Sequence, residues 1–265
     1  MMVLDGPFEI ADSVRYAYDK DDELNPIDKE QFYSTESYYS NIGLKISPDI
    51  TPDIYKHLEI VCSRLKLPIK RVRAFVISKS VINAHCISFD KEICIIALYS
   101  ELINIMSPKE IQFIIGHEIG HFLMNHNYFD NDPNITEEES IRSRAGEISS
   151  DRIGLIGCNN LDAAVKSMIR LQSGLSDKFL RFDTGAFLSQ MKTEEPYREH
   201  LYQTTHPSAT IRANALLRFS LSEPYQRLIN NERGTKLSII DNQIKKDLDG
   251  YFRKKEKSLL DDWFS

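Results

Sequence analysis

A pair of histidines inside an apolar stretch constrains this chain more than any other feature of its 265 residues. His117 and His121 belong to the pattern H-E-I-G-H, which lies within the apolar run 111–124. In a helix the two residues are separated by about 400° of rotation and about 6 Å of rise, so both imidazoles lie on one face. Two nitrogens placed in this way can reach a single metal ion. Glu118, about 100° round the helix from His117, can reach a water beside that ion.

The residues before the pattern predict that it is helical. Ser107, Pro108 and Glu110 form a capping-box sequence, in which Ser107 is the N-cap and Pro108 the first helical residue. The apolar residues that follow recur at helical spacing, so the helix is expected to bury one face. A glycine between the histidines, Gly120, allows another element to pack closely beside them.

Composition limits the class of protein. The net charge of −6 argues against nucleic-acid binding. The sequence contains no run of 18 apolar residues, so no membrane span is predicted. The first residues have neither a basic region nor a sustained apolar core, so no signal peptide is expected. Four scattered cysteines without a C-x-x-C pair indicate reduced, buried thiols. We therefore expect a cytoplasmic protein.

The order of apolar patterns predicts an α+β fold that is mainly helical. Short β-branched segments at 72–78, 84–89 and 92–97 predict a small sheet, and the two-residue connection 90–91 predicts a hairpin between the last two strands. An edge strand of this sheet is expected to flank the histidine helix. The expected helices are 52–67, 98–105, 108–124, 136–156, 160–171, 207–221, 223–231 and one within 235–264.

The two ends of the chain are harder to interpret. Residues 1–52 are acidic, rich in tyrosine and weakly patterned, which is typical of a loosely structured extension that wraps the core. The alternative is a pro-region or lid that covers the cleft. Residues 223–265 are expected to form a helical segment that packs on the central domain, 53–222; a helix that binds a partner is the alternative.

A catalytic zinc ion needs a third protein ligand beside the two histidines. The metzincin extension is excluded, because Met124 and Asn127 occupy the positions of its glycine and final histidine. Glu147 lies on the next predicted helix, and the polar loop between the two helices lets them pack antiparallel, giving a His₂Glu site. Asp151, one turn further on, can accept a proton from a ligand imidazole. The glutamates at 137–139 lie nearer the loop and are expected to serve the helix N-terminus.

Three sequence blocks together resemble a known family. H-E-I-G-H, then E-I-S-S-D at 147–151, then Thr205-His206-Pro207 followed by Arg212, are similar to the gluzincin peptidases of the HtpX and CAAX-prenyl-protease type, metallopeptidase family forty-eight. The resemblance covers residues 70–220. It implies that His117, His121 and Glu147 bind one Zn²⁺ per chain, that Glu118 is the general base, and that Asp151 supports a ligand.

The resemblance implies further roles for residues whose local pattern is less informative. His206 matches a histidine that stabilises the oxyanion beside the zinc ion, and Arg212 matches the residue that supports it. From the sequence alone, His206 simply precedes a helix that starts with proline at its first position. Asn83 and Ala84 resemble the family's edge-strand signature, along which a peptide can pair; alternatively, Asn83 only begins a strand.

These observations predict a zinc metalloendopeptidase that acts on a peptide or protein substrate. Many relatives embed this domain among membrane helices, so their membrane substrates are not carried over. Two alternatives are a latent protease blocked by its terminal segments and a non-catalytic zinc-binding interaction module. The intact Glu118 argues against the module, because a structural zinc site needs no base. The sequence does not indicate the oligomeric state.

Overall fold

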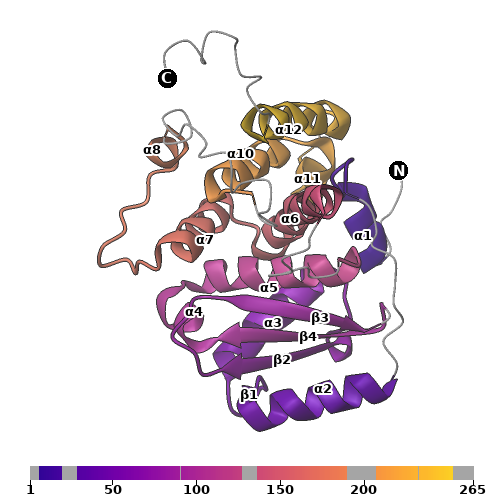
Figure 1. Ribbon diagram of the computed structural model, residues 1–265, viewed down its shortest axis with the longest axis vertical. Coiled ribbons are helices and arrows are strands. Elements are labelled where there is room, and N and C mark those ends of the chain that lie inside the picture. Colours follow the sequence, from indigo (N-terminus) through magenta and orange to yellow (C-terminus); the bar gives the residue numbers. More distant parts are fainter. Residues whose placement is uncertain are drawn as a thin grey trace.

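The computed structural model describes residues 6–19, 29–89, 91–126, 136–189, 207–231 and 233–252. A four-stranded sheet lies at one side of the molecule, and most helices stack in layers on the other (Figure 1). The predicted α+β class is confirmed. Among the described residues, no helix is both long enough and apolar enough to cross a membrane.

The sheet has the strand order β1-β2-β4-β3, so β3 is an edge strand. Strand β2 pairs in parallel with β4, and β3 pairs antiparallel with β4, which confirms the predicted hairpin. The connection is one residue longer than predicted, because Phe89 pairs directly with Ile93 and leaves Glu92 in the turn. The strands are β1 (Gly43–Lys45), β2 (Val72–Ile77), β3 (Ala84–Phe89) and β4 (Ile93–Tyr99).

Both faces of the sheet are covered, by different helices. On one face, Ala74, Cys86 and Ile96 belong to the main apolar cluster, which is shared with α3 (Pro52–Arg64) and α5 (Pro108–Leu123). On the other face, the sheet packs against α2 (Lys29–Ile42), whose Tyr39 lies against Phe75. Alternating side chains of one strand can therefore reach two apolar layers.

Helices α5 and α6 (Glu137–Cys158) form the centre of the fold, and both begin with capping boxes, of which that of α5 was predicted. Glu139 closes the box of α6 by accepting from the backbone N–H of Thr136. The two helices approach closely through glycine. A Cβ built on Gly120 would lie 2.8 Å from Cα of Ser150. Gly120 therefore permits the close packing predicted for it, because any side chain there would push α6 away.

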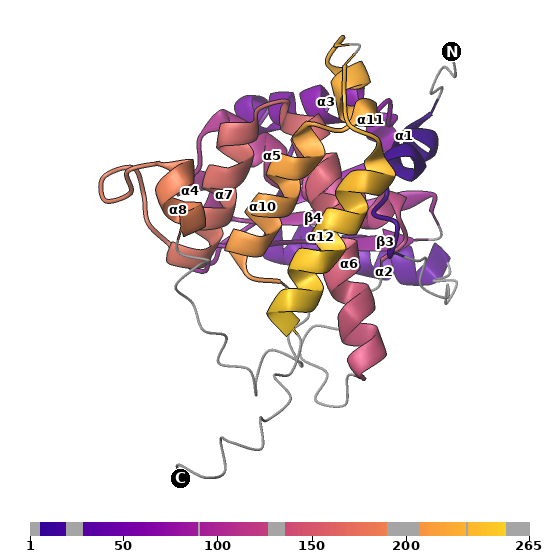
Figure 2. The same cartoon turned by 90° about the horizontal axis from the view of Figure 1, so that it is seen from above.

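Helices α7, α10 and α12 lie over α5 and α6 (Figures 1 and 2). Helix α10 begins two residues later than predicted: Ser208 is its N-cap, so Pro207 precedes the helix. The Ser208 hydroxyl accepts a hydrogen bond from a backbone N–H of the first turn. Pro207 has no hydroxyl and cannot cap the helix in this way. The remaining elements are η1 (Ile69–Arg71), α4 (Ser100–Ile105), α7 (Leu161–Ser173), α8 (Thr184–Ser189), α10 (Ala209–Ser220), α11 (Glu223–Leu228) and α12 (Leu237–Phe252).

The N-terminal segment is more ordered than its sequence pattern indicates. It contains α1 (Pro7–Val14), α2 and β1, and Ile10 and Val14 of α1 are buried in the main apolar cluster. Helix α1 packs against both α5 and α6. Tyr225 of α11 joins the same cluster, so residues from the beginning, middle and end of the chain share one core.

Candidate metal centre

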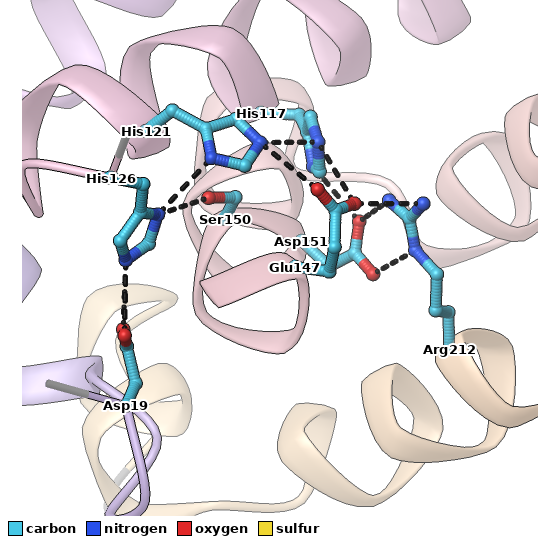
Figure 3. A network of polar contacts seen from close by, with 8 residues as sticks. All are labelled: Asp19, His117, His121, His126, Glu147, Ser150, Asp151 and Arg212. Carbon is cyan, nitrogen blue, oxygen red and sulfur yellow. Dashed lines mark hydrogen bonds and ion pairs between the residues drawn. The ribbon is translucent and has the colours of Figure 1, made fainter. Parts of the chain in front are cut away.

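Helix geometry brings His117 and His121 together on the inner face of α5, where their Nε2 atoms lie 3.0 Å apart (Figure 3). Glu147 of α6 faces both. Its Oε2 is 3.5 Å from Nε2 of His117, and its Oε1 is 3.4 Å from Nε2 of His121. All three residues are buried. Within the described part of the chain, this is the one group of histidine, cysteine and acidic side chains that converges closely enough to hold a metal ion.

The separation of these atoms suits zinc. With zinc–nitrogen distances near 2.0–2.1 Å, ligand atoms at the corners of a tetrahedron are roughly 3.3 Å apart. The three observed separations, from 3.0 to 3.5 Å, bracket that value. Two imidazoles and one carboxylate are also a donor set that zinc hydrolases use, and they leave a fourth position for water. The residues present therefore fit a zinc ion.

On the far side of His117, an acidic and a basic residue fix the ring. The Nδ1 of His117 lies 3.0 Å from Oδ1 of Asp151, and Arg212 donates to both oxygens of Asp151. The guanidinium of Arg212 also lies 2.9 Å from Oε2 of Glu147. Arg212 of α10 therefore forms ion pairs with two buried carboxylates of α6 at once (Figure 3).

These charges determine the protonation states. Burial raises the pKa of Asp151, but the Arg212 guanidinium outweighs burial and holds the pKa of that carboxyl below its usual value. Burial lowers the pKa of His117, but the carboxylates of Glu147 and Asp151 outweigh it and raise that pKa above the usual value. The two carboxylates thus favour the protonated imidazole of His117 more than burial disfavours it.

His121 lies in a different environment. Burial lowers its pKa to about 3, so the ring is neutral near pH 7 and one nitrogen keeps a lone pair for a metal ion. Its Nδ1 lies 3.1 Å from Nδ1 of His126, and Nε2 of His126 lies 3.1 Å from each carboxylate oxygen of Asp19. Figure 3 shows this row of side chains leading away from the ligand cluster toward the N-terminal segment.

A cleft of about 500 Å³ opens onto the cluster. Glu118 lines it together with His117 and Glu147, and Asn83 and Ala84 lie along the same cleft where edge strand β3 begins. Asn83 accepts from the backbone N–H of Ala84 through its side-chain oxygen. The other lining residues are Val81, Ile82, His85, Tyr99, Phe113, Ile114, Leu171 and Arg212.

The structure thus brings eight of the nine sequence-predicted site residues to one place. The ninth, His206, lies outside the described residues, so its position relative to the cleft stays a prediction. Arg212, expected beside His206, contacts Asp151 and Glu147.

Sequence reasoning missed two residues of the polar network, His126 and Asp19. The available signal for His126 was its place in the sequence, five residues after His121. It lies one position before residue 127, where the metzincin motif has its final histidine. Asp19 carries no comparable signal, because it lies 107 residues earlier in an acidic stretch.

A helix with H-E-x-x-H, a glutamate from the next helix and a flanking edge strand define the zincin-like class of metallopeptidase folds. The model of peptidase family M48 matches residues 49–131, from the residues before α3 through the H-E-x-x-H helix. This part of the chain is therefore similar to peptidase family M48, and the relatives described next support the same similarity.

Two relatives illustrate the similarity. Plastoglobule-localized metallopeptidase 48 of Arabidopsis thaliana is 22% identical over 184 residues, which cover 58% of this chain and 54% of the plant protein. A protease HtpX homologue of Streptococcus pneumoniae is 30% identical over 91 residues, which cover 34% of this chain and 30% of that protein. The chain therefore matches about half or less of each relative's length. No solved structure gives a significant match.

Proposed function

We propose that this protein is a zinc-dependent endopeptidase in which Glu118 is the general base. The observation that carries the proposal is the position of Glu118, which lines the cleft beside the convergent His117 and Glu147. The similarity of residues 49–131 to a metallopeptidase family and the acidic–basic network behind the ligands support it. Glu118 is buried where it lines this cleft, and peptide hydrolysis requires a base at such a position.

In this proposal His117, His121 and Glu147 hold one zinc ion per chain. Bound zinc supplies a Lewis acid and lowers the pKa of a water molecule to about 7. Glu118 takes a proton from the attacking water and returns it to the leaving amine. Asp151 holds the His117 ring, and His206 stabilises the developing negative charge on the carbonyl oxygen.

The substrate is proposed to be a peptide or an extended segment of a protein. Among the strands that the structure describes, β3 pairs only with β4, so its outer edge can add a further strand. Asn83 and Ala84 at its start line the cleft and are the proposed main-chain contacts. Such pairing gives affinity with little dependence on side chains. The central 53–222 peptidase domain, its two terminal segments and the cytoplasmic location stay predictions.

The decisive experiment compares Glu118→Gln with the wild-type protein. Zinc content is measured by mass spectrometry, and cleavage of a denatured protein is followed with and without a chelator. We expect the variant to keep its zinc but lose turnover, because the amide cannot accept the proton. Glu138→Gln is the matched control, since that side chain is 80% exposed on α6. Absence of zinc from the wild type, or equal cleavage by Glu118→Gln, would overturn the proposal.

The latent alternative receives no support from the described residues. None of those before Val81 lines the cleft. The described residues of the N-terminal segment also include buried core positions such as Ile10 and Val14, so deleting residues 1–45 would remove part of the core. Chelator-sensitive cleavage by the full chain distinguishes the protease from a non-catalytic zinc-binding module.

A further inference from the structure

The second metal-ligand candidate on α5, His121, is held by a row of side chains that the proposed chemistry does not use. His126 lies between His121 and Asp19, with 3.1 Å separations on both sides. The side chains of His126 and Asp19 are 9% and 1% exposed, respectively. The buried Asp19 and His121 and the mostly buried His126 are in contact, so they constitute a polar network whose hydrogen bonds are satisfied largely within the protein.

The contacts of Asp19 assign the hydrogens of both rings. Both oxygens of Asp19 lie 3.1 Å from Nε2 of His126, and a carboxylate can only accept, so this nitrogen donates. In a neutral ring, Nδ1 of His126 is then the acceptor, and it accepts from Nδ1 of His121. The remaining nitrogen of His121, Nε2, is left with its lone pair directed at the candidate metal position.

The end of α5 places His126 beside His121 by means of the backbone. Asn125 adopts a left-handed conformation, with φ of 55°, and its N–H donates to the carbonyl of Phe122. The N–H of His126 donates to the carbonyl of His121 at 3.0 Å. This is the hydrogen-bond pattern of a Schellman motif, which turns the chain back over the last helical turn. The same two histidines are therefore joined by a backbone and a side-chain contact.

Helix α6 leaves space for the His126 ring at one position. A Cβ built on Gly146 would lie 3.2 Å from the ring atoms Cε1 and Nδ1 of His126. Any larger residue at 146 would therefore press on the ring. This close approach is independent of the hydrogen bonds and shows that both helices accommodate the same orientation of His126.

The N-terminal segment places Asp19 by separate contacts. The N–H of Asp19 donates to the carbonyl of Tyr16 at 2.8 Å, and the N–H of Tyr16 donates to Oγ of Ser149 on α6. The N–H of Ala17 donates to Asp241 on α12. The turn that carries Asp19 is thus fixed to two helices of the core.

We propose that Asp19 and His126 are positioning residues that hold His121 for metal binding, so that the N-terminal segment completes the metal centre. The inference rests on the proposed function only in requiring that His121 is a metal ligand. It gives the two histidines parallel arrangements: His117 is backed directly by Asp151, and His121 is backed by Asp19 through His126. A partner of this kind fixes the ring and increases its basicity as a ligand.

The test is zinc affinity, measured by competition with a chromophoric chelator, in the full chain. Asp19→Asn keeps the shape of the side chain but loses the charge. We expect Asp19→Asn and His126→Ala each to bind zinc about 10- to 100-fold more weakly than wild type. Asp12→Asn is the matched control, because that acidic side chain, on the preceding helix, is 72% exposed. Its zinc affinity should equal that of the wild type.

A double variant separates positioning from a general structural effect. If Asp19 acts through His126, Asp19→Asn should cause no further loss of zinc affinity in the His126→Ala background. Urea unfolding of each metal-free variant reports damage to the fold independently. Gly146→Ala, which presses on the ring without changing a polar group, should also weaken zinc binding.

The outcomes distinguish the two proposals. A wild-type protein that binds no zinc overturns both the proposed function and this inference. A wild type that binds zinc, with Asp19→Asn indistinguishable from Asp12→Asn, overturns the inference alone. The inference also fails if Asp19→Asn weakens binding equally with and without His126, because Asp19 would then act by another route.

Discussion

Arg212 on α10 donates from Nε and Nη2 to the two oxygens of Asp151 on α6, at 2.8 and 2.6 Å. The same guanidinium reaches Glu147 at 2.9 Å, so one cation serves two buried carboxylates that lie one helical turn apart. Each carboxylate faces His117. Helix α10, although far along the chain, is therefore part of the electrostatic balance of the metal centre.

Replacing Arg212 should destabilise the metal-free protein strongly. Arg212→Met leaves two buried negative charges without their cation, and breaking a buried pair in this way typically costs about 3–5 kcal/mol. Zinc should restore part of this loss, because the ion supplies positive charge at the same place. Urea unfolding with and without zinc measures both effects. Arg181→Met, at an exposed position, is the control. If Arg212→Met and Arg181→Met lost the same free energy of unfolding, the assigned role of Arg212 would be contradicted.

Packing between α5 and α6 gives a second prediction. Gly120→Ala places a methyl group 2.8 Å from Cα of Ser150, a contact that side-chain rotation cannot relieve. Overpacking of this kind typically costs about 1–3 kcal/mol and moves helices apart. Because His121 and Glu147 lie on opposite helices, we expect zinc affinity and unfolding free energy to fall together. Gly6→Ala, with open space around its Cβ and no contact with the α5–α6 interface, should leave zinc affinity unchanged.

Local patterns predicted the parts of the site that lie close together along the chain. The histidine pair, its capping residues and the one-turn spacing of Glu147 and Asp151 are properties of single helices. Periodicity and capping rules therefore suffice for them. The fold class followed from the same patterns, because strand and helix periods differ.

Contacts between distant segments were not predictable in the same way. No local signal associates Asp19 with His126, or Arg212 with Asp151, because these contacts depend on how the helices are stacked. Helix α1 is only eight residues long, and its buried residues meet α5 and α6, so tertiary packing stabilises it. The acidic, tyrosine-rich composition of the N-terminal segment concealed that role.

The C-terminal helix gives a third prediction. Arg152 of α6 and Asp241 of α12 form a buried ion pair at 2.5 Å, and Asp241 also accepts from the backbone N–H of Ala17. Asp241→Asn should cost about 3–5 kcal/mol, because Arg152 would keep an unpaired buried charge. Asp249→Asn breaks an exposed pair with Lys245 on the same helix and should cost less than about 1 kcal/mol. If urea unfolding gave Asp241→Asn and Asp249→Asn the same free energy of unfolding, the Arg152–Asp241 pair would not be what holds α12.

The buried thiols predict how stability depends on alkaline pH. Burial raises the pKa of Cys62 to about 12 and that of Cys158 to about 11, and both are free cysteines. An unfolded chain loses these protons near pH 9, whereas the folded protein keeps them. The contribution of each buried thiol to the free energy of unfolding is therefore fully present below pH 9. It is lost as the pH rises toward the pKa of that thiol in the folded protein. The slope is about 1.4 kcal/mol per pH unit for each thiol.

A cysteine variant isolates this effect. Cys62→Ala removes one titrating group, so its unfolding free energy should fall less steeply between pH 9 and pH 11 than that of the wild type. At pH 8 the variant should be the less stable protein, because it leaves a cavity, and the difference should narrow as the pH rises. Urea unfolding under reducing conditions at each pH measures both slopes. Parallel slopes would mean that Cys62 has the same pKa in the folded and the unfolded chain, so that burial does not control it.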